Sequence, residues 1–184
     1  RHDRRGYIAG IDLRAPGDFT DSIFDVSDND GLWTAMYVGA QALRYGATKD
    51  PAARAAAKKS MDALLDLERL SGIPGFPARA VVTDEEIAAG VRGFSATAKV
   101  HAVGETANVW YRSPRVPGLW CKGDTSSDEL DGHYFAWYLY HDLVADDAEK
   151  AEIAAVVRRV TDGILANNFT LVDHTGRKTR WGVW

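Results

Sequence analysis

Two clusters of acidic residues hold the side chains best suited to chemistry. Each stands directly before a long, mostly apolar segment, and the members are Asp28, Asp30, Asp124, Asp128, Glu129 and Asp131. Cleavage of a glycosidic bond needs two carboxyl groups, one protonated to assist departure and one ionised to activate water or attack the sugar. The clusters therefore predict a carboxylate site. Asp30 and Asp131 are its first candidates, because each precedes a glycine at a matching position.

A helix end explains some of these acids without any catalysis. Asp and Ser are preferred N-cap residues, so plain capping is the alternative interpretation for each aspartate. The second cluster, however, carries four acids within residues 124–131, which is more than one helix end needs. Asp128 and Glu129 therefore join the catalytic candidates. The helix dipole favours ionised carboxylates at these positions, so a base or nucleophile is easier to place here than an acid.

His133 offers a second chemistry at the same helix start. With Tyr134 it could form the acid–base pair of a polysaccharide lyase, which removes a proton beside a uronate carboxyl group. Arg79, Arg112 or Arg177 could neutralise that carboxyl group. The alternative for His133 is a structural histidine bound to a nearby carboxylate.

Aromatic and cationic side chains supply candidates for substrate binding, because sugar rings stack on aromatic platforms while charged groups bind their hydroxyls. The candidates are Trp33, Arg79, Trp110, Trp120, Tyr134 and Trp181. The alternative for the aromatic residues within helices is core packing. No metal-binding motif is complete, so we expect no cofactor. Calcium at the acidic clusters is the one metal left open.

An internal repeat indicates which elements position these residues. Asp-Gly opens apolar segments at 31–45 and at 132–144, and each is followed by an amphipathic helical pattern that ends near residue 70 or 166. The first helix of each pair is apolar almost all round, so we expect it to be buried on most sides. Asp50 and Pro51 are typical of an N-cap and the first position of a helix.

The segments between and after these pairs contain shorter signals. Thr83–Glu86 is a capping-box sequence that predicts a short helix to about residue 89. Residues 91–126 predict a long ordered loop with possible strand pairing, and such a loop is usually functional. Residues 171–181 predict a β-hairpin that turns at 174–176.

Paired helices repeated around an axis describe an all-α fold, an α/α-hairpin toroid, here a partial (α/α)6 barrel with long loops and a small β-hairpin. The chain resembles the six-hairpin glycosidase-like superfamily in four stretches, which are residues 27–37, 72–79, 122–133 and 179–184. The resemblance implies one partial toroid domain over 1–184, with hairpin units at about 28–80 and 127–184. In a toroid the N-termini of inner helices gather at one mouth, which would bring the two acidic clusters together.

The composition limits the classes of partner that the protein can have. A net charge of −4 and isolated basic pairs such as Arg4-Arg5, expected to be solvated, argue against nucleic acid. No apolar run is long enough to insert in a membrane. Cys121 is the single cysteine, so no internal disulfide forms. The first residue is Arg and the last is Trp184, from which we expect a fragment, completed by the remainder of a parent chain or by self-association.

Three functions remain open at this point. The first is a glycoside hydrolase that acts on a carbohydrate through its carboxylates, and the second is the lyase. The third is a non-catalytic toroid that binds glycan or protein. Fold alone does not choose among them. A secreted or periplasmic location is slightly favoured over a cytoplasmic one.

Overall fold

The computed structural model describes residues 1–26, 29–96 and 110–184, and over these ranges the fold is mixed α/β. Of the described residues, 49% are helical and 20% are in strands, and they form five helices and four small antiparallel sheets. The prediction of an all-α toroid is therefore wrong. Most of the unexpected strands have only two to four residues, which is too short for alternating hydrophobicity to be recognised.

Two helical hairpins form the larger part of the molecule. The first joins α1 (Asp30–Thr48) to α2 (Pro51–Ser71), and the second joins α4 (Ser127–Leu143) to α5 (Asp147–Ala166). As predicted, the Asp50 carboxylate caps α2 by accepting the Ala52 N–H at 2.8 Å, with Pro51 in the first turn. Gly72 then ends α2 in the left-handed conformation, at φ 75°.

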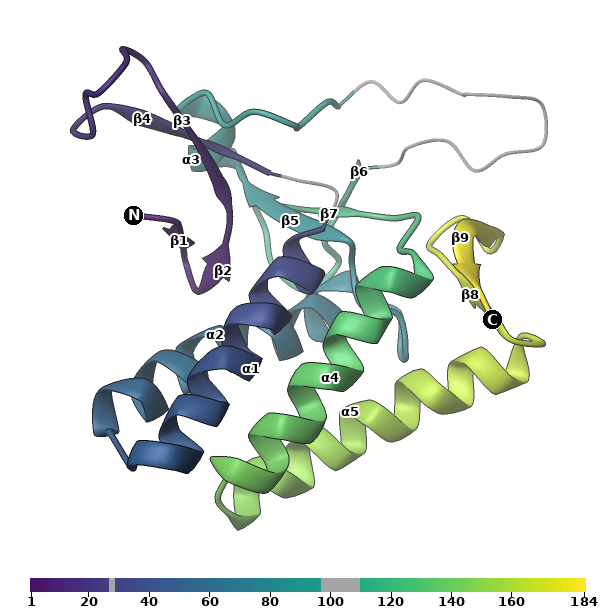
Figure 1. The fold of residues 1–184 in the computed structure, drawn as a ribbon. Helices are drawn as coiled ribbons and strands as arrows, with labels where there is room; N and C mark the ends of the chain where they lie inside the picture. Colours follow the sequence, from purple (N-terminus) through teal and green to yellow (C-terminus); the bar gives the residue numbers. More distant parts are fainter. Residues whose placement is uncertain (27–28, 97–109) are drawn as a thin grey trace.

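Helices α1 and α4 pack side by side and run in the same direction (Figure 1). Small residues allow their close approach. A side-chain carbon added at Gly132 of α4 would lie 3.0 Å from the Leu32 Cα of α1, and one added at Gly39 would meet the Phe135 ring. The N-terminal ends of α1 and α4 are thereby brought together.

Short strands gather around these N-terminal ends (Figure 1). The N-terminal segment forms two hairpins, β1 (Asp3–Arg4) with β2 (Tyr7–Ile8) and β3 (Gly10–Leu13) with β4 (Ser22–Asp25). A three-stranded sheet has the order β5 (Ala80–Thr83), β7 (Leu119–Lys122), β6 (Trp110–Arg112). The last two of these strands lie in the expected loop 91–126, of which residues 97–109 are outside the described part.

The two remaining local predictions are confirmed. Helix α3 (Asp84–Ala88) starts with a complete capping box, in which Thr83 Oγ1 accepts the Glu86 N–H and the Glu86 carboxylate accepts the Thr83 N–H. Strands β8 (Thr170–Val172) and β9 (Lys178–Val183) form the C-terminal hairpin.

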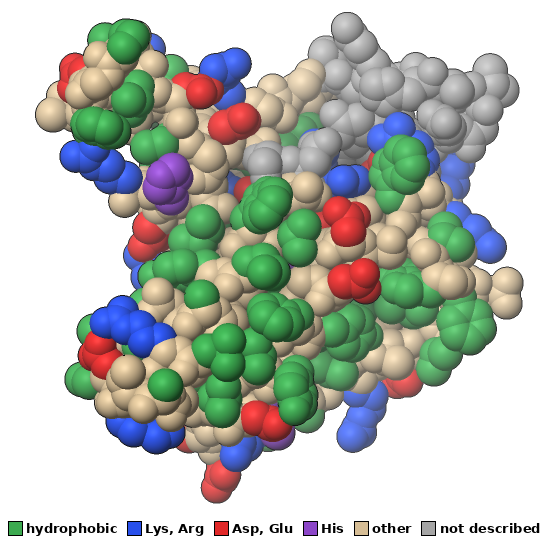
Figure 2. Space-filling view, viewed as in Figure 1, with side chains coloured by type: hydrophobic (Ala, Val, Ile, Leu, Met, Phe, Trp, Pro, Cys, Tyr) green, Lys and Arg blue, Asp and Glu red, His purple; other side chains and the backbone are tan. Residues whose placement is uncertain are grey.

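The two inner helices are not buried on most sides, contrary to expectation. Their contact with each other and with α2 and α5 forms the core, which includes Ala35, Leu64 and Trp137. The opposite side of α1 and α4 is open, and we call it the open face. Its large apolar side chains are Trp33, Met36, Leu43, Phe135 and Tyr138, with Trp33 52% and Tyr138 66% exposed. Apolar side chains cover much of the surface in Figure 2, with acidic ones among them.

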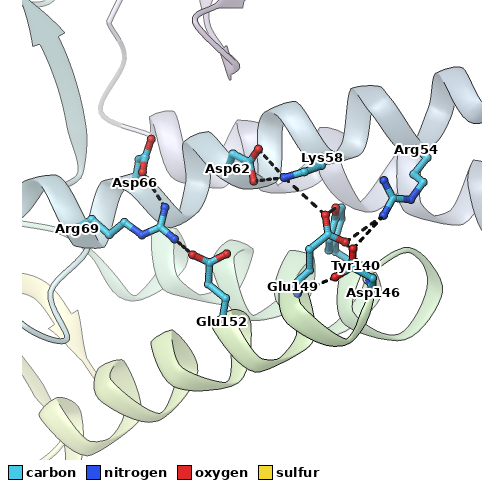
Figure 3. A network of polar contacts seen from close by, with 9 residues as sticks. All are labelled: Arg54, Lys58, Asp62, Asp66, Arg69, Tyr140, Asp146, Glu149 and Glu152. Carbon is cyan, nitrogen blue, oxygen red and sulfur yellow. Dashed lines mark hydrogen bonds and ion pairs between the residues drawn. The ribbon is translucent and has the colours of Figure 1, made fainter.

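An ion-pair network joins the two outer helices α2 and α5 (Figure 3). The Glu149 carboxylate is its centre, since it accepts hydrogen bonds from Arg54 at 3.2 Å and from the Tyr140 hydroxyl at 3.0 Å, and it lies 3.6 Å from the Lys58 ammonium. Arg69 pairs with Asp66 and Glu152 further along. The network fixes α5 against α2 on the side away from the open face.

None of the described helices combines the length and the apolar character that a membrane crossing requires.

Candidate functional site

Glu129 joins the N-terminal ends of α1 and α4. Its carboxylate, which α4 carries and which is fully buried, accepts the backbone N–H groups of Gly31 at 3.2 Å and of Leu32. Asn29, the N-cap residue of α1, makes no side-chain capping bond, so Glu129 caps α1 from the neighbouring hairpin. Burial raises the pKa of Glu129 to about 8, against the lowering effect of these hydrogen bonds. This candidate has a structural role in the fold.

Asp30 also has a structural role in the fold. It is fully buried and forms an ion pair with Arg4, whose guanidinium also donates to the Val81 carbonyl at 2.9 Å and to Glu86 at 3.1 Å. Burial raises the pKa of Asp30 to about 6, while Arg4 acts in the opposite direction. Arg4 is itself buried, so the expectation of a solvated Arg4-Arg5 pair is wrong for Arg4. The first-choice catalytic candidate Asp30 is thus buried and held by Arg4.

His133 and Tyr134 occupy different sides of α4. His133 is buried against α1, where it leaves no room for a side chain at Gly31, and burial lowers its pKa to about 3. Neither ring nitrogen has a hydrogen-bond partner among the described residues. The Tyr134 hydroxyl instead contacts Thr161 Oγ1 of α5 at 2.6 Å. The structure does not bring the two groups together as an acid–base pair.

The segment that leads into α4 is buried although it is polar. Asp124 accepts the Arg180 backbone N–H and its guanidinium, each at 2.8 Å, and its carbonyl accepts from Arg79 at 2.8 Å. The Thr125 hydroxyl donates to the Pro77 carbonyl at 2.7 Å. Arg79, a predicted substrate-binding residue, therefore anchors this segment, and the β8–β9 hairpin holds the start of α4 in place.

Asp128 and Asp131 differ from the other acids because they are exposed. Neither carboxylate forms a hydrogen bond or an ion pair with another residue in the described part of the chain, so neither serves as a cap. Three residues apart on α4, they lie on one face of the helix, with Cβ atoms about 5–6 Å apart. Continued along α4, that face carries Phe135 and Tyr138. These two acids are available to a ligand.

Trp33 lies at the same level as Asp131. Gly132 of α4 packs against Leu32 of α1. The next residue along α1 is Trp33 and the residue before Gly132 is Asp131, so these two lie on neighbouring turns of the two helices. Trp33 is exposed on the open face, which makes it the predicted aromatic binder best placed beside the carboxylates. Asp128, Asp131 and Trp33 form what we call the carboxylate site.

The other predicted aromatic binders lie elsewhere. Trp110 is buried with its ring 5.2 Å from that of Phe94, and Trp120 donates its indole N–H to Asp84 at 3.0 Å beneath the Arg112 guanidinium. Trp181 is exposed on β9, beside Arg180. Asp28 lies outside the described residues.

No family model, curated protein or solved structure matches the chain. Over the described ranges, no group of three His, Cys, Asp or Glu side chains is placed to hold a metal ion.

Sequence reasoning missed four contributors to this region. Arg4 and Glu86 are separated from Asp30 by 26 and 56 positions, and no local pattern links them. Phe135 and Tyr138 are spaced from Asp128 and Asp131 at helical intervals. That spacing was visible, but an apolar helix was expected to bury them.

Proposed function

We propose that the chain is a carbohydrate-active domain that hydrolyses glycosidic bonds at the carboxylate site. One observation carries the proposal. Of the acids at the shared helix ends, Asp30, Asp124 and Glu129 are buried and bound within the protein, whereas Asp128 and Asp131 face solvent without a partner in the described part. Carboxylates without a structural task, beside exposed aromatic rings, match the needs of sugar binding and cleavage.

The spacing of the two carboxylates suits the reaction. Residues three apart on a helix place their carboxyl groups at a separation that side-chain rotation can adjust over several ångströms, which spans the separations of about 5–9.5 Å used by glycosidases. Asp128 is assigned as the base or nucleophile, since it stands in the first turn of α4, where the helix dipole favours a negative charge. Asp131, further along the helix, is assigned as the proton donor. Water adds across the broken C–O bond.

Aromatic side chains extend the site along the open face. Trp33 from α1 is exposed beside the carboxylates, and Phe135 and Tyr138 are exposed further along α4. Stacking on such rings would align an oligosaccharide with the helices. The lyase alternative loses support, because His133 is buried and Tyr134 points toward α5.

Two variants and a matched control test the assignment. Asp131→Asn and Asp128→Asn should each lower turnover of the best oligosaccharide substrate by about 100-fold or more, as expected for loss of a general acid or base. Asp142→Asn removes another exposed acid from α4, three turns away, and should leave turnover unchanged.

Equal turnover by the wild type and by both site variants would contradict the proposed hydrolysis at Asp128 and Asp131. Saturable sugar binding without any product would instead assign the chain to the non-catalytic binding class.

A further inference from the structure

A hollow with no residue in common with the carboxylate site lies where α2 ends. It measures about 510 Å³, and its walls come from the last turn of α2, the turn that follows it, Arg159 of α5 and Arg115 of the loop between β6 and β7. Ligand sites for small molecules typically measure about 300–1,000 Å³. The size therefore suits one small molecule.

Two of the three arginines around this hollow are held in place by carboxylates. Arg159 donates from Nε and Nη2 to Glu68, each at 2.9 Å, and the same carboxylate accepts the Gly75 N–H at 2.9 Å. Arg69 pairs with Asp66 at 3.0 Å and with Glu152 (Figure 3). These pairs neutralise their charges and fix the walls of the hollow.

Arg115 is the uncompensated charge. Its guanidinium is exposed and makes no hydrogen bond or ion pair with the rest of the described chain. The charges of Arg69 and Arg159 are balanced by Asp66 and Glu68, so the lining residues carry one net positive charge, and Glu152 beside Arg69 lies outside the lining. An arginine with five N–H donors and no partner is suited to a carboxylate, which it can bind through two parallel hydrogen bonds.

The remaining walls indicate what the carboxylate is attached to. Leu70, Ile73 and Pro74 supply an apolar surface. Asp66 uses one carboxylate oxygen for Arg69, and its second oxygen can accept a hydroxyl hydrogen. The lining therefore offers a positive charge, an apolar surface and a hydroxyl acceptor, which together fit a ligand with a carboxylate, an apolar ring face and a hydroxyl group.

From these three features we propose that the hollow binds a sugar acid of one ring, with its carboxylate on Arg115 and a hydroxyl group on Asp66. This inference does not depend on catalysis at the carboxylate site, and its test uses binding alone.

Titration calorimetry with sodium D-glucuronate tests the proposal on the whole chain, with D-glucose as the uncharged ring of the same size. Glucuronate should bind saturably and at least about tenfold more tightly than glucose, since its carboxylate would accept hydrogen bonds from a charged guanidinium. Arg115→Gln should weaken glucuronate binding about tenfold or more. Arg158→Gln, which removes an exposed arginine outside the hollow, should not change it.

Arg115 makes no side-chain bond to the described chain, so its variant should keep the fold, and circular dichroism checks this. The proposal is overturned if wild-type protein shows no saturable glucuronate binding, if Arg115→Gln binds like the wild type, or if glucose binds equally well.

Discussion

Burial separates the acidic side chains into two groups with different tasks. Asp30 and Glu129 lie inside the molecule, where one meets Arg4 and the other caps α1. Asp128 and Asp131 are exposed to solvent, although each lies within two residues of Glu129 on α4. Neighbours in the sequence thus differ in role, because successive helical residues point about 100° apart. The sequence predicts a carboxylate site at these helix starts, but it does not show which of the carboxylates are exposed to a ligand.

The buried group predicts an unusual pH dependence of stability. The pKa of Glu129 in the folded protein is raised to about 8, so the folded state holds a proton that the unfolded state releases near its ordinary value. Stability contributed in this way is present at low pH and is lost as the pH rises toward 8. His133 acts oppositely, with a pKa lowered to about 3, but its effect is complete above about pH 6.5. The pKa of Asp30 is raised to about 6, so this residue changes the stability little above pH 6.

Between pH 6.5 and 8, the free energy of unfolding should therefore fall by on the order of 1–2 kcal/mol. Urea denaturation at a series of pH values measures this slope. Glu129→Gln should be less stable than the wild type but should lack the slope. A wild-type protein with constant stability over this interval would contradict the burial of Glu129 as described.

At the scale of the elements, the close packing of α1 on α4 sets the geometry of the carboxylate site. Gly31→Ala should lower the free energy of unfolding by about 1–3 kcal/mol, because the added methyl group meets the buried His133 ring and the Glu129 carboxylate. Gly163→Ala on α5 is the matched control. Its methyl group would find only ordinary contact, at 3.7 Å from the Gly75 carbonyl, so this variant should gain about 0.5–1 kcal/mol. Equal effects of the two substitutions would argue against the tight α1–α4 contact.

The α2–α5 network predicts a stability term that depends on salt. Glu149→Gln weakens the bonds to Arg54, Lys58 and Tyr140 at once and should cost about 1–2 kcal/mol at low ionic strength. The loss should shrink in 1 M sodium chloride, where surface charges are screened. Asp162→Asn, an exposed acid of α5 without a partner in the described part, should show neither effect. A cost for Glu149→Gln that does not change with salt would contradict an electrostatic network.

Local signals predicted the helices and the C-terminal hairpin, but they did not predict the N-terminal strands or the pairings between distant residues. Asp50-Pro51 and the Thr83–Glu86 box each act within one turn of a helix, so their structures followed from neighbouring residues alone. Strands β1 to β4 are too short to show a period, and their presence makes the fold mixed α/β. The contact of Glu129 with Gly31 spans 98 positions and has no local signature. The contact of Glu129 with the start of α1 could therefore not be predicted from the sequence, although helices α1 and α4 were predicted.

The whole molecule presents one side of two parallel helices to solvent. Its large exposed side chains, Trp33, Phe135 and Tyr138 among them, form a wider apolar surface than isolated exposed residues would. Under the proposed function, part of this surface is the platform for a sugar chain that ends at Asp128 and Asp131. Association with a second copy stays a prediction from the sequence.

The most direct test of carbohydrate hydrolysis is mass spectrometry of products formed in ¹⁸O-labelled water from a panel of neutral and uronate-containing oligosaccharides. We expect shorter oligosaccharides that carry one added water with the label at the new reducing end, and no such products from Asp131→Asn. Unsaturated products that lack this water, or no products from any substrate in the panel, would contradict it.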